Sequence, residues 1–153
     1  MSGIMYENEE SLANESAFRS LYEKYYCNTL EKMPIRYQID FSVLEGKRGP
    51  FKPFKVCGFI EFKQRSNARR KYKTVIIPLG KLQASKRLYE YTGKDTLLWI
   101  QWTDTSGWCL LNTVDFDLRW QGVSRRNDDR DKEPVIHIPI GAFTRSKWEP
   151  SKF

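Results

Sequence analysis

The chain has little of the side-chain chemistry on which many enzymes depend, since its 153 residues include one histidine and three cysteines. Because His137 is the only histidine, we exclude most zinc chemistry, the Ser-His-Asp triad and the Cys-His dyad. The cysteines are odd in number and widely spaced, so they predict neither a disulfide framework nor a zinc knuckle and fit a reducing compartment. Any catalysis must therefore rest on carboxylates, lysine or tyrosine.

Long apolar runs are also missing. No run approaches the roughly 18 apolar residues that span a bilayer, and the first 16 residues are acidic and polar, unlike a secretory signal. We therefore expect no membrane partner and a cytoplasmic location, in the host cell if the protein is viral. No internal repeat stands out, and a chain of 153 residues suits one domain, so we predict a single domain over residues 1–153.

What the chain has in excess is positive charge. Lysine and arginine number 26 against 19 acidic residues, which gives a formal charge of +7 and an isoelectric point near 9.3. An excess of this size favours polyanionic partners, with nucleic acid first and an anionic membrane second. Many soluble proteins are also basic, so composition alone does not decide the partner.

The first half of the chain predicts a helix and a hairpin. Residues Glu9 to about Tyr26 lack Gly and Pro and carry an apolar stripe at three- and four-residue steps, which predicts a helix. Tyr37–Val43 alternates strictly, with Asp40 on its polar face, and predicts a strand. Val56–Lys63 predicts a second strand, joined to the first by a basic loop rich in Gly and Pro. The helix stripe consists of Leu12, Glu15, Phe18, Tyr22 and Tyr25.

The second half predicts another helix and more strands. Lys81 to about Tyr91 is expected to be helical and to end at Gly93. Thr96–Trp102 is nearly continuously apolar, which predicts a central strand covered on both faces, with Trp99 and Trp102 in the core. These elements predict an α/β or α+β fold with helices packed on a sheet. Also expected are a short apolar run at Thr74–Leu79, a hairpin strand at Trp108–Leu111 after a turn at Thr105–Gly107, a charged loop at Gln121–Glu133, and a strand at Val135–Ile140 that Pro139 confines to a sheet edge.

Two carboxylates and a lysine on the predicted hairpin are candidates for chemistry. Glu61 and Lys63 lie two residues apart and so leave the same face of their strand, and Asp40 lies on the polar face of the preceding strand. If the strands are neighbours, the three side chains converge on a patch that suits a hard cation such as Mg²⁺. The alternative is an exposed ion pair worth less than about 1 kcal/mol. Against that alternative, Glu61 interrupts a strand that is otherwise apolar, where an unpartnered carboxylate is costly.

These residues resemble the motif of the PD-(D/E)XK nuclease superfamily, which includes Holliday-junction resolvases, many restriction endonucleases and small phage nucleases. The motif reads Ile39-Asp40, a gap of 20 residues, then Glu61-Phe62-Lys63, on a hairpin with one helix before it and one after. Ile39 replaces the proline of the family. The resemblance covers roughly Glu9 to Leu111 and implies a restriction-endonuclease-like core, a central mixed β-sheet flanked by helices; residues 115–153 form an extension whose role it leaves open. A second triplet, Glu45-Gly46-Lys47, follows Asp40 too closely to be the motif.

The resemblance also implies roles for individual residues. Asp40 and Glu61 would bind Mg²⁺ or Mn²⁺ together with the backbone carbonyl of Phe62, and Lys63 would act on the attacking water. Two further positions complete the implied site. Resolvase-like members carry a glutamate on the first helix, for which Glu15 fits best because it lies on the helix stripe; otherwise Glu15 is a solvated helix residue. Gln64 resembles a polar residue that some members place near the scissile phosphate.

Basic residues follow the motif directly and suit a phosphate backbone. Such charges fix position on a nucleic acid without reading its sequence, and Tyr72 or an exposed tryptophan is a candidate to stack on a base. The alternative is a solvated loop. Lys81 and Lys86 of the second helix are interpreted as plain surface residues, and His137 as structural or exposed. The candidate nucleic-acid-binding residues are Arg65, Arg69, Arg70, Lys71 and Lys73, with Lys47, Arg48, Lys52 and Lys55 from the preceding loop.

The function predicted from these observations is metal-dependent hydrolysis of phosphodiester bonds in DNA. So small a domain suits the recognition of DNA ends or shape better than that of a long sequence, and a homodimer is compatible with folds of this kind. The alternative from another class is a catalytically inactive protein that keeps the nuclease fold and binds nucleic acid or another partner. An inhibitor or a structural component of a mobile element leaves no trace in the sequence.

Overall fold

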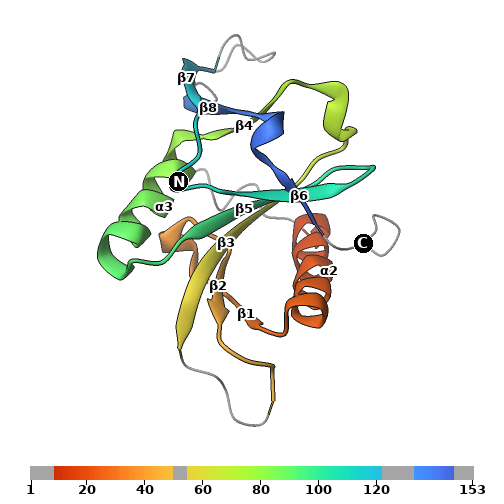
Figure 1. Cartoon of the computed structure of the whole chain (residues 1–153), viewed down its shortest axis with the longest axis vertical. Coiled ribbons are helices and arrows are strands. Elements are labelled where there is room, and N and C mark those ends of the chain that lie inside the picture. The colour runs from red at the N-terminus through yellow and green to blue at the C-terminus, as the bar shows by residue number, and fades with distance from the viewer. Residues whose placement is uncertain (1–8, 50–54, 122–132, 147–153) are drawn as a thin grey trace.

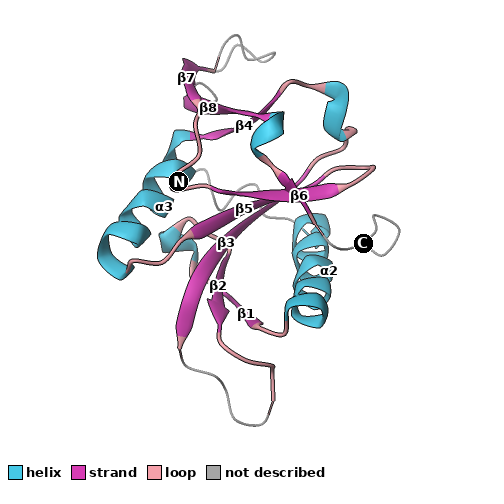
Figure 2. Ribbon diagram, in the orientation of Figure 1, coloured by secondary structure: helices cyan, strands magenta, loops and turns pink. Residues whose placement is uncertain are grey.

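The computed structural model describes residues 9–49, 55–121 and 133–146. Within these ranges the α-helices are α2 (Glu9–Tyr26) and α3 (Leu79–Thr92), and short 3₁₀ helices lie at η1 (Ile35–Tyr37), η2 (Arg69–Lys71) and η4 (Ile140–Ala142). The strands form two sheets (Figure 1; Figure 2). The larger sheet has the order β1-β2-β3-β5-β6-β9, with β1 (Thr29–Lys32), β2 (Phe41–Leu44), β3 (Val56–Gln64), β5 (Thr96–Gln101), β6 (Ser106–Leu110) and β9 (Thr144–Arg145). The smaller sheet has the order β4-β8-β7, with β4 (Thr74–Pro78), β8 (Pro134–Pro139) and β7 (Asp117–Trp120).

The larger sheet is mixed. Strands β3 and β5 are parallel neighbours, and the other pairs in this sheet are antiparallel. A parallel pair needs a crossover connection, which the chain supplies through η2, β4 and α3. Helices α2 and α3 lie against opposite faces of the sheet (Figure 1). The predicted fold class is therefore confirmed: a central mixed sheet flanked by helices, as in restriction-endonuclease-like folds.

Alternating residues of β3 and β5 face two different cores. On one face, the ring of Phe18 in α2 lies 4.4 Å from that of Phe62 and 5.4 Å from that of Trp99, measured between centroids. On the other face, Leu98 of β5 is fully buried in a cluster that includes Leu82 of α3. Because period-two alternation sends neighbouring residues to opposite faces, the residues of β3 between Ile60 and Gln64 that do not pack on α2 are directed toward the α3 side.

The smaller sheet corrects the prediction for the last strand. The sequence placed Val135–Ile140 at a sheet edge, but β8 lies between β4 and β7. Pro139 is the final residue of β8 and pairs only with Thr74 of β4, so its missing N–H interrupts no interior bond of the ladder. Ile136 and Ile138 are fully buried in the same cluster as the α3 residues. Part of the predicted C-terminal extension therefore completes this core.

The first hairpin is shorter than predicted and has an extra strand. Tyr37 ends the 3₁₀ turn η1, and Gln38 has a φ of 61°, a left-handed conformation that interrupts strict alternation. Strand β2 therefore begins at Phe41, directly after Asp40. The sequence analysis missed β1, which pairs with β2 along its outer side.

Other expected elements are confirmed with small shifts. Helix α2 has the predicted bounds, and α3 ends at Gly93, which has a φ of 70° and donates its N–H to the carbonyl of Tyr89. Trp99 and Trp102 are buried as expected. The predicted turn at Thr105–Gly107 is wrong, because Trp102 N donates to Thr105 O at 2.9 Å and β6 already begins at Ser106. Most of the predicted charged loop, residues 122–132, lies outside the described residues, as does Lys52. None of the described helices has the length and apolar character that crossing a bilayer requires.

The packing of α2 leads to a prediction about stability. Replacing the fully buried Phe18 with Ala should lower the free energy of unfolding by about 3–5 kcal/mol, because it removes the ring that fills the space between α2 and the sheet. Replacing Leu12, which is 47% exposed on the same helix, should change it by less than about 0.5 kcal/mol. Urea unfolding measures both, and equal effects would contradict this description of the core.

Candidate active site

The start of β2 and the middle of β3 bring Asp40 and Glu61 together. The backbone N–H of Asp40 donates to Glu61 Oε1 at 3.2 Å, and the backbone N–H of Phe62 donates to Asp40 Oδ2 at 2.8 Å. These two bonds continue the β2–β3 pairing one residue beyond the strand end, with side-chain oxygens in place of backbone carbonyls. The predicted neighbourhood of the two carboxylates is therefore present in the structure.

Glu61 is fully buried, and two lysines neutralise it. Its Oε2 atom lies 3.3 Å from Lys63 Nζ and 3.1 Å from Lys81 Nζ. Lys81 Nζ also donates to the backbone carbonyl of Gln38 at 2.6 Å, which ties the start of α3 to the segment before β2. Burial, and then repulsion by Asp40, raise the pKa of Glu61 to about 6, although both lysines act in the opposite direction.

Glu15 joins the same group of charges from the α2 side. Lys32 Nζ lies 2.6 Å from Glu15 Oε2 and 3.6 Å from Asp40 Oδ1, so one ammonium group connects two carboxylates. Burial, followed by repulsion from Asp40, raises the pKa of Glu15 to about 7, while Lys32 opposes the shift. The predicted orientation of Glu15 toward the sheet is therefore correct. We call Glu15, Asp40 and Glu61, with Lys32, Lys63 and Lys81, the carboxylate cluster.

The donor set of the cluster fits a magnesium-type ion better than a zinc-type ion. Among the described residues, no three acidic, histidine or cysteine side chains converge closely enough to hold a metal by themselves. Mg²⁺ is typically bound by one or two carboxylates, with water and phosphate oxygens completing its shell. Asp40 and Glu61 place hard oxygen atoms side by side, and the backbone N–H of Phe62 faces Asp40. The residues present therefore fit a hard divalent cation that keeps open positions.

Sequence reasoning missed two members of the cluster. Lys81 was interpreted as a plain surface residue, which is wrong because it contacts Glu61 and the Gln38 carbonyl. Lys32 lies on the strand that the sequence did not reveal. The one available signal was the cost of burying Glu61, which demands cations from elsewhere in the chain. Lys86 is exposed on the surface, as predicted, and its Nζ donates to the Asn112 carbonyl at 2.9 Å.

Gln64 is not brought to the cluster. It follows Phe62 by two residues on β3, so alternation directs it toward the α2 face, whereas Glu61 and Lys63 leave the opposite face. Its side chain is exposed at the end of the strand. A role for Gln64 at the scissile phosphate therefore stays a prediction that the cluster geometry does not favour.

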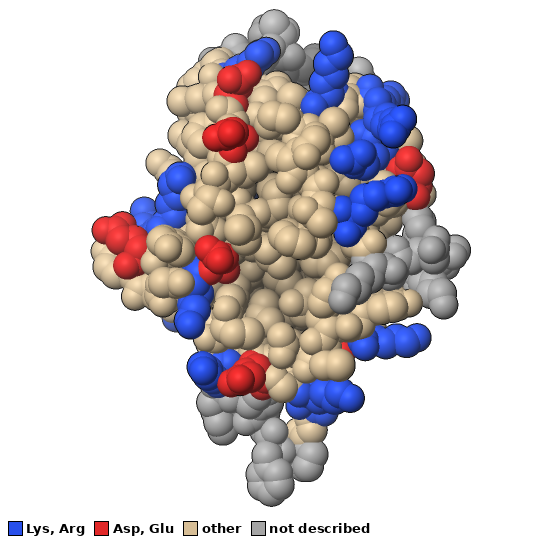
Figure 3. All heavy atoms as spheres, viewed as in Figure 1, with Lys and Arg blue, Asp and Glu red and all other residues tan. Residues whose placement is uncertain are grey.

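The basic segment after β3 divides into anchored residues and exposed residues. Arg65 donates to the Ile76 carbonyl at 2.9 Å, and burial lowers the pKa of its guanidinium. Arg69 donates to the Ile140 carbonyl at 3.1 Å and lies over the ring of Trp102. These two arginines stabilise the fold. Exposed side chains on the same segment are Arg70, Lys71, Tyr72 and Lys73, and Figure 3 shows Lys and Arg side chains gathered where Figure 1 places η2.

The basic residues of the first hairpin loop do not lie beside the cluster. The loop precedes Val56, so it is separated from Glu61 by about 16 Å of strand at some 3.3 Å per residue. Arg48 forms ion pairs there with Glu23 at 3.1 Å and with Glu31 at 3.2 Å. These carboxylates, and Glu23 more than Glu31, raise the pKa of the Arg48 guanidinium. Lys47 is exposed at the same end. The described residues Lys47 and Arg48 therefore lie toward the opposite end of β3 from Glu61, and their part in nucleic-acid binding stays a prediction.

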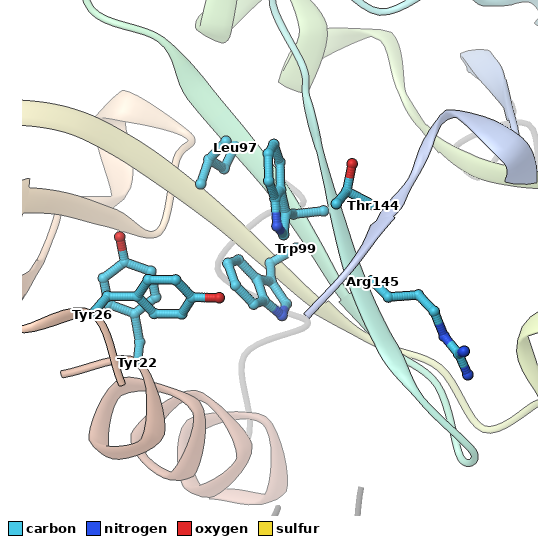
Figure 4. Close-up of a pocket in the computed structure, with 7 residues that line it drawn as sticks. Tyr22, Tyr26, Leu97, Trp99, Thr144 and Arg145 are labelled. Atoms are coloured by element: carbon cyan, nitrogen blue, oxygen red, sulfur yellow. The ribbon is translucent and has the colours of Figure 1, made fainter. Parts of the chain in front are cut away.

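A pocket of about 280 Å³ lies elsewhere, between the end of α2 and strands β5, β6 and β9 (Figure 4). Tyr22 and Tyr26 of α2 face Trp99 across it, and Arg145 is the charged residue of its lining. Among the described residues no carboxylate lines it, whereas the carboxylate cluster combines the buried Glu61 and two further acids with cations. We therefore place the candidate chemistry at the cluster and not in this pocket. The pocket is lined by Tyr22, Tyr26, Leu97, Trp99, Trp108, Thr144 and Arg145.

A mixed sheet with a helix on each face, an Asp directly before one strand and a Glu-X-Lys triplet on the neighbouring strand are the features of the PD-(D/E)XK nuclease class. Comparison with protein families agrees: residues 2–146 match the model described as "Phage putative PDDEXK endonuclease". The chain therefore belongs to this family of phage PD-(D/E)XK endonucleases. Searches of curated proteins and of solved structures found no match.

The burial of Glu61 leads to a prediction about pH. The pKa of Glu61 is near 4.5 in the unfolded chain and about 6 in the folded protein, so the folded protein holds this proton more tightly. Ionisation of Glu61 therefore destabilises the fold progressively as the pH rises from 4.5 through about 6. In EDTA, Glu61→Gln should gain stability over the wild type across this window, by about 2 kcal/mol at neutral pH. Chemical unfolding at several pH values measures the difference. A difference that does not grow with pH would contradict the burial of an ionised Glu61.

Proposed function

We propose that the protein is a metal-dependent nuclease that hydrolyses phosphodiester bonds in DNA, acting at ends or at particular DNA shapes. The observation that carries this proposal is the fully buried Glu61 beside Asp40 on adjacent strands, with Lys63 on the same face. A carboxylate in that position costs stability, and its pKa of about 6 reflects that cost. Membership of an endonuclease family supports catalysis as the reason for the arrangement.

Asp40 and Glu61 would hold Mg²⁺ or Mn²⁺, together with the backbone carbonyl of Phe62. In a strand the carbonyl of a residue leaves on the same side as its N–H, and the Phe62 N–H faces Asp40. The bound ion would activate a water molecule and neutralise charge on the phosphate. Lys63 would orient that water or balance developing negative charge, because its ammonium group reaches Glu61 and is partly exposed.

The lysines have a second role in this proposal. With no cation bound, Lys63 and Lys81 balance Glu61, and Lys32 balances Asp40 and Glu15. Glu15, with a pKa of about 7, can gain or lose a proton near neutral pH and is the candidate proton carrier of the cluster. We propose it, and less directly the exposed Gln64, as auxiliary residues of catalysis.

For the substrate path we propose the exposed segment after β3. Arg70, Lys71 and Lys73 present their charges to solvent, and Tyr72, which is 57% exposed, can stack on a base. The segment starts at the end of the strand that carries Glu61 and Lys63, so a backbone bound there can continue toward the cluster. Arg65, Arg69, Lys47 and Arg48 remain secondary candidates, because three of the four are engaged by carbonyls or carboxylates.

One observation favours the alternative, a nucleic-acid-binding protein that keeps the fold without catalysis. The ammonium groups of Lys63 and Lys81 already lie within ion-pair distance of Glu61, so the cluster is electrostatically balanced without a metal. In that case binding would depend on the basic segment alone. The metal dependence of cleavage and of stability separates the two functions.

We also propose that residues 1–153 form one nuclease domain, since the family match spans residues 2–146 and β8 shares a core with α3. We place its action in the cytoplasm, because the cysteines Cys27, Cys57 and Cys109 are free. A homodimer is the assembly we expect to act on DNA.

The first functional prediction concerns metal-dependent cleavage of labelled single-stranded, duplex and four-way-junction DNA. Wild type should cleave at least one of these with Mg²⁺ or Mn²⁺ and none in EDTA. Asp40→Asn, Glu61→Gln and Lys63→Ala should each lose about a hundredfold or more, since each removes a metal ligand or a cation at the reacting phosphate. Glu90→Gln, at an exposed acid of α3, is the control and should keep full activity.

A readout without turnover accompanies this experiment. Mg²⁺ should raise the melting temperature of the wild type and of Glu90→Gln but not of Asp40→Asn. If metal neither raises the melting temperature nor supports cleavage of any DNA, the protein is instead a catalytically inactive nucleic-acid-binding protein. Full cleavage by Asp40→Asn would overturn the site assignment itself.

The second functional prediction concerns the basic segment. The double variant Arg70→Ala, Lys73→Ala should bind DNA more weakly and lower the slope of log affinity against log salt by about two, as expected for two lost phosphate contacts. Lys24→Ala, Arg87→Ala removes the same charge from exposed positions on α2 and α3 and should leave the slope unchanged. Fluorescence anisotropy at several salt concentrations measures both. Equal losses in the two variants would mean that only net charge matters.

A further inference from the structure

Strand β7 is the outer strand of the smaller sheet, and one of its edges faces away from β8 (Figure 1). The backbone N–H of Gln121 donates to the carbonyl of Glu133 at 2.9 Å. Along an antiparallel ladder every second residue forms backbone hydrogen bonds with the neighbouring strand, so this bond fixes which residues of β7 do so. Arg119 and Asp117 are therefore the residues that bond to β8. The backbone N–H and carbonyl of Leu118 point outward, as do those of Trp120.

The two outer edges of this sheet differ. At the β4 edge, the guanidinium of Arg65 donates to the outward carbonyl of Ile76, so a side chain occupies that edge. At the β7 edge, no hydrogen bond reaches the outward groups of Leu118 from any residue in 9–49, 55–121 or 133–146. An edge strand with free backbone groups is a template for another strand.

The side chains of this edge are apolar in a way that edge strands usually avoid. Phe116, Leu118 and Trp120 alternate along one face and are 36%, 59% and 63% exposed. Asp117 and Arg119 alternate on the other face, are exposed, and lie 3.5 Å apart at their closest charged atoms. Exposed apolar residues grouped in this way mark an interaction surface.

The order of these five residues identifies the partner. Read from either end, the segment runs aromatic, charged, Leu, oppositely charged, aromatic. We propose that two copies of the chain pair β7 with β7 antiparallel, across a two-fold axis at Leu118. Leu118 then faces Leu118 of the partner subunit with two backbone hydrogen bonds, and Asp117 faces Arg119 of the partner subunit on both sides of the axis. Phe116 faces Trp120 of the partner subunit.

This arrangement uses the outward backbone groups, the apolar face and the charged face together. It joins the two small sheets into one continuous sheet of two copies, and because the contact is isologous it closes as a dimer. A different protein could form hydrogen bonds with the outward backbone groups of β7, but its strand would also need charges in the same order. A second copy of the chain has that order in its own β7.

The experiment measures the mass of the full chain by sedimentation velocity over a range of concentrations. Wild type should approach twice the mass of the 18.2 kDa chain as concentration rises. Arg119→Asp opposes acid to acid and Asp117→Arg opposes base to base at two places in the dimer, so each should raise the dissociation constant about tenfold or more. A mixture of the two single variants restores both opposite-charge pairs and should form a heterodimer.

The mixture guards against a loss of folding, because misfolded variants would not recover by mixing. Tyr91→Ser, at a residue of α3 that is 79% exposed, is the control and should dimerise like the wild type. A wild type that stays monomeric at every concentration overturns the proposal, as do single variants that dimerise normally or a mixture that stays monomeric. Because the readout is mass and not cleavage, either result is independent of the proposed nuclease activity.

Discussion

The constraint on which the rest of this structure depends is the complete burial of one carboxylate, Glu61, in the middle of a sheet. A buried charge without partners would be prohibitively costly, so cations must be brought to it. Lys63 comes from its own strand, and Lys81 comes from the start of α3, where it also bonds the Gln38 carbonyl. The crossover helix is thus tied to the segment before β2 by the same ammonium group that neutralises the acid.

Strand β3 serves the fold and the site with alternate residues. Ile60 and Phe62 are buried against α2, while Glu61 and Lys63 leave the other face toward Lys81. Because Glu61 and Phe62 are consecutive on one strand, the stacking of Phe62 on Phe18 also fixes the backbone position of the acid. Such rigidity suits a site that must keep two carboxylates close in spite of their repulsion, which adds to the effect of burial in raising the pKa of Glu61.

Sequence patterns predicted the helices and strands that show a periodic arrangement of apolar residues. They did not predict the residues that come together only through tertiary contacts. The alternation of β3, the apolar run of β5 and the stripe of α2 are local signals, and they gave the fold class and the neighbourhood of Asp40 and Glu61. Lys32 and Lys81 could not be found in this way, because no spacing tells which helix start or short strand lies beside a given acid. The central place of β8 was missed because Pro139 ends the strand, where a missing N–H breaks no interior bond.

The positive charge of the chain shows why composition overstates an electrostatic surface. Arg48 is held by Glu23 and Glu31, and Arg65 and Arg69 are held by the backbone carbonyls of Ile76 and Ile140. Lys32 balances the half-buried Glu15 and Asp40, and Lys63 and Lys81 balance the buried Glu61. Guanidinium groups are well suited to such anchoring because their fork of donors reaches several acceptors at once. A net charge of +7 therefore does not measure the charge available to a partner; that charge depends on the exposed cations that remain, and those of Arg70, Lys71 and Lys73 follow directly on the strand that carries the buried acid.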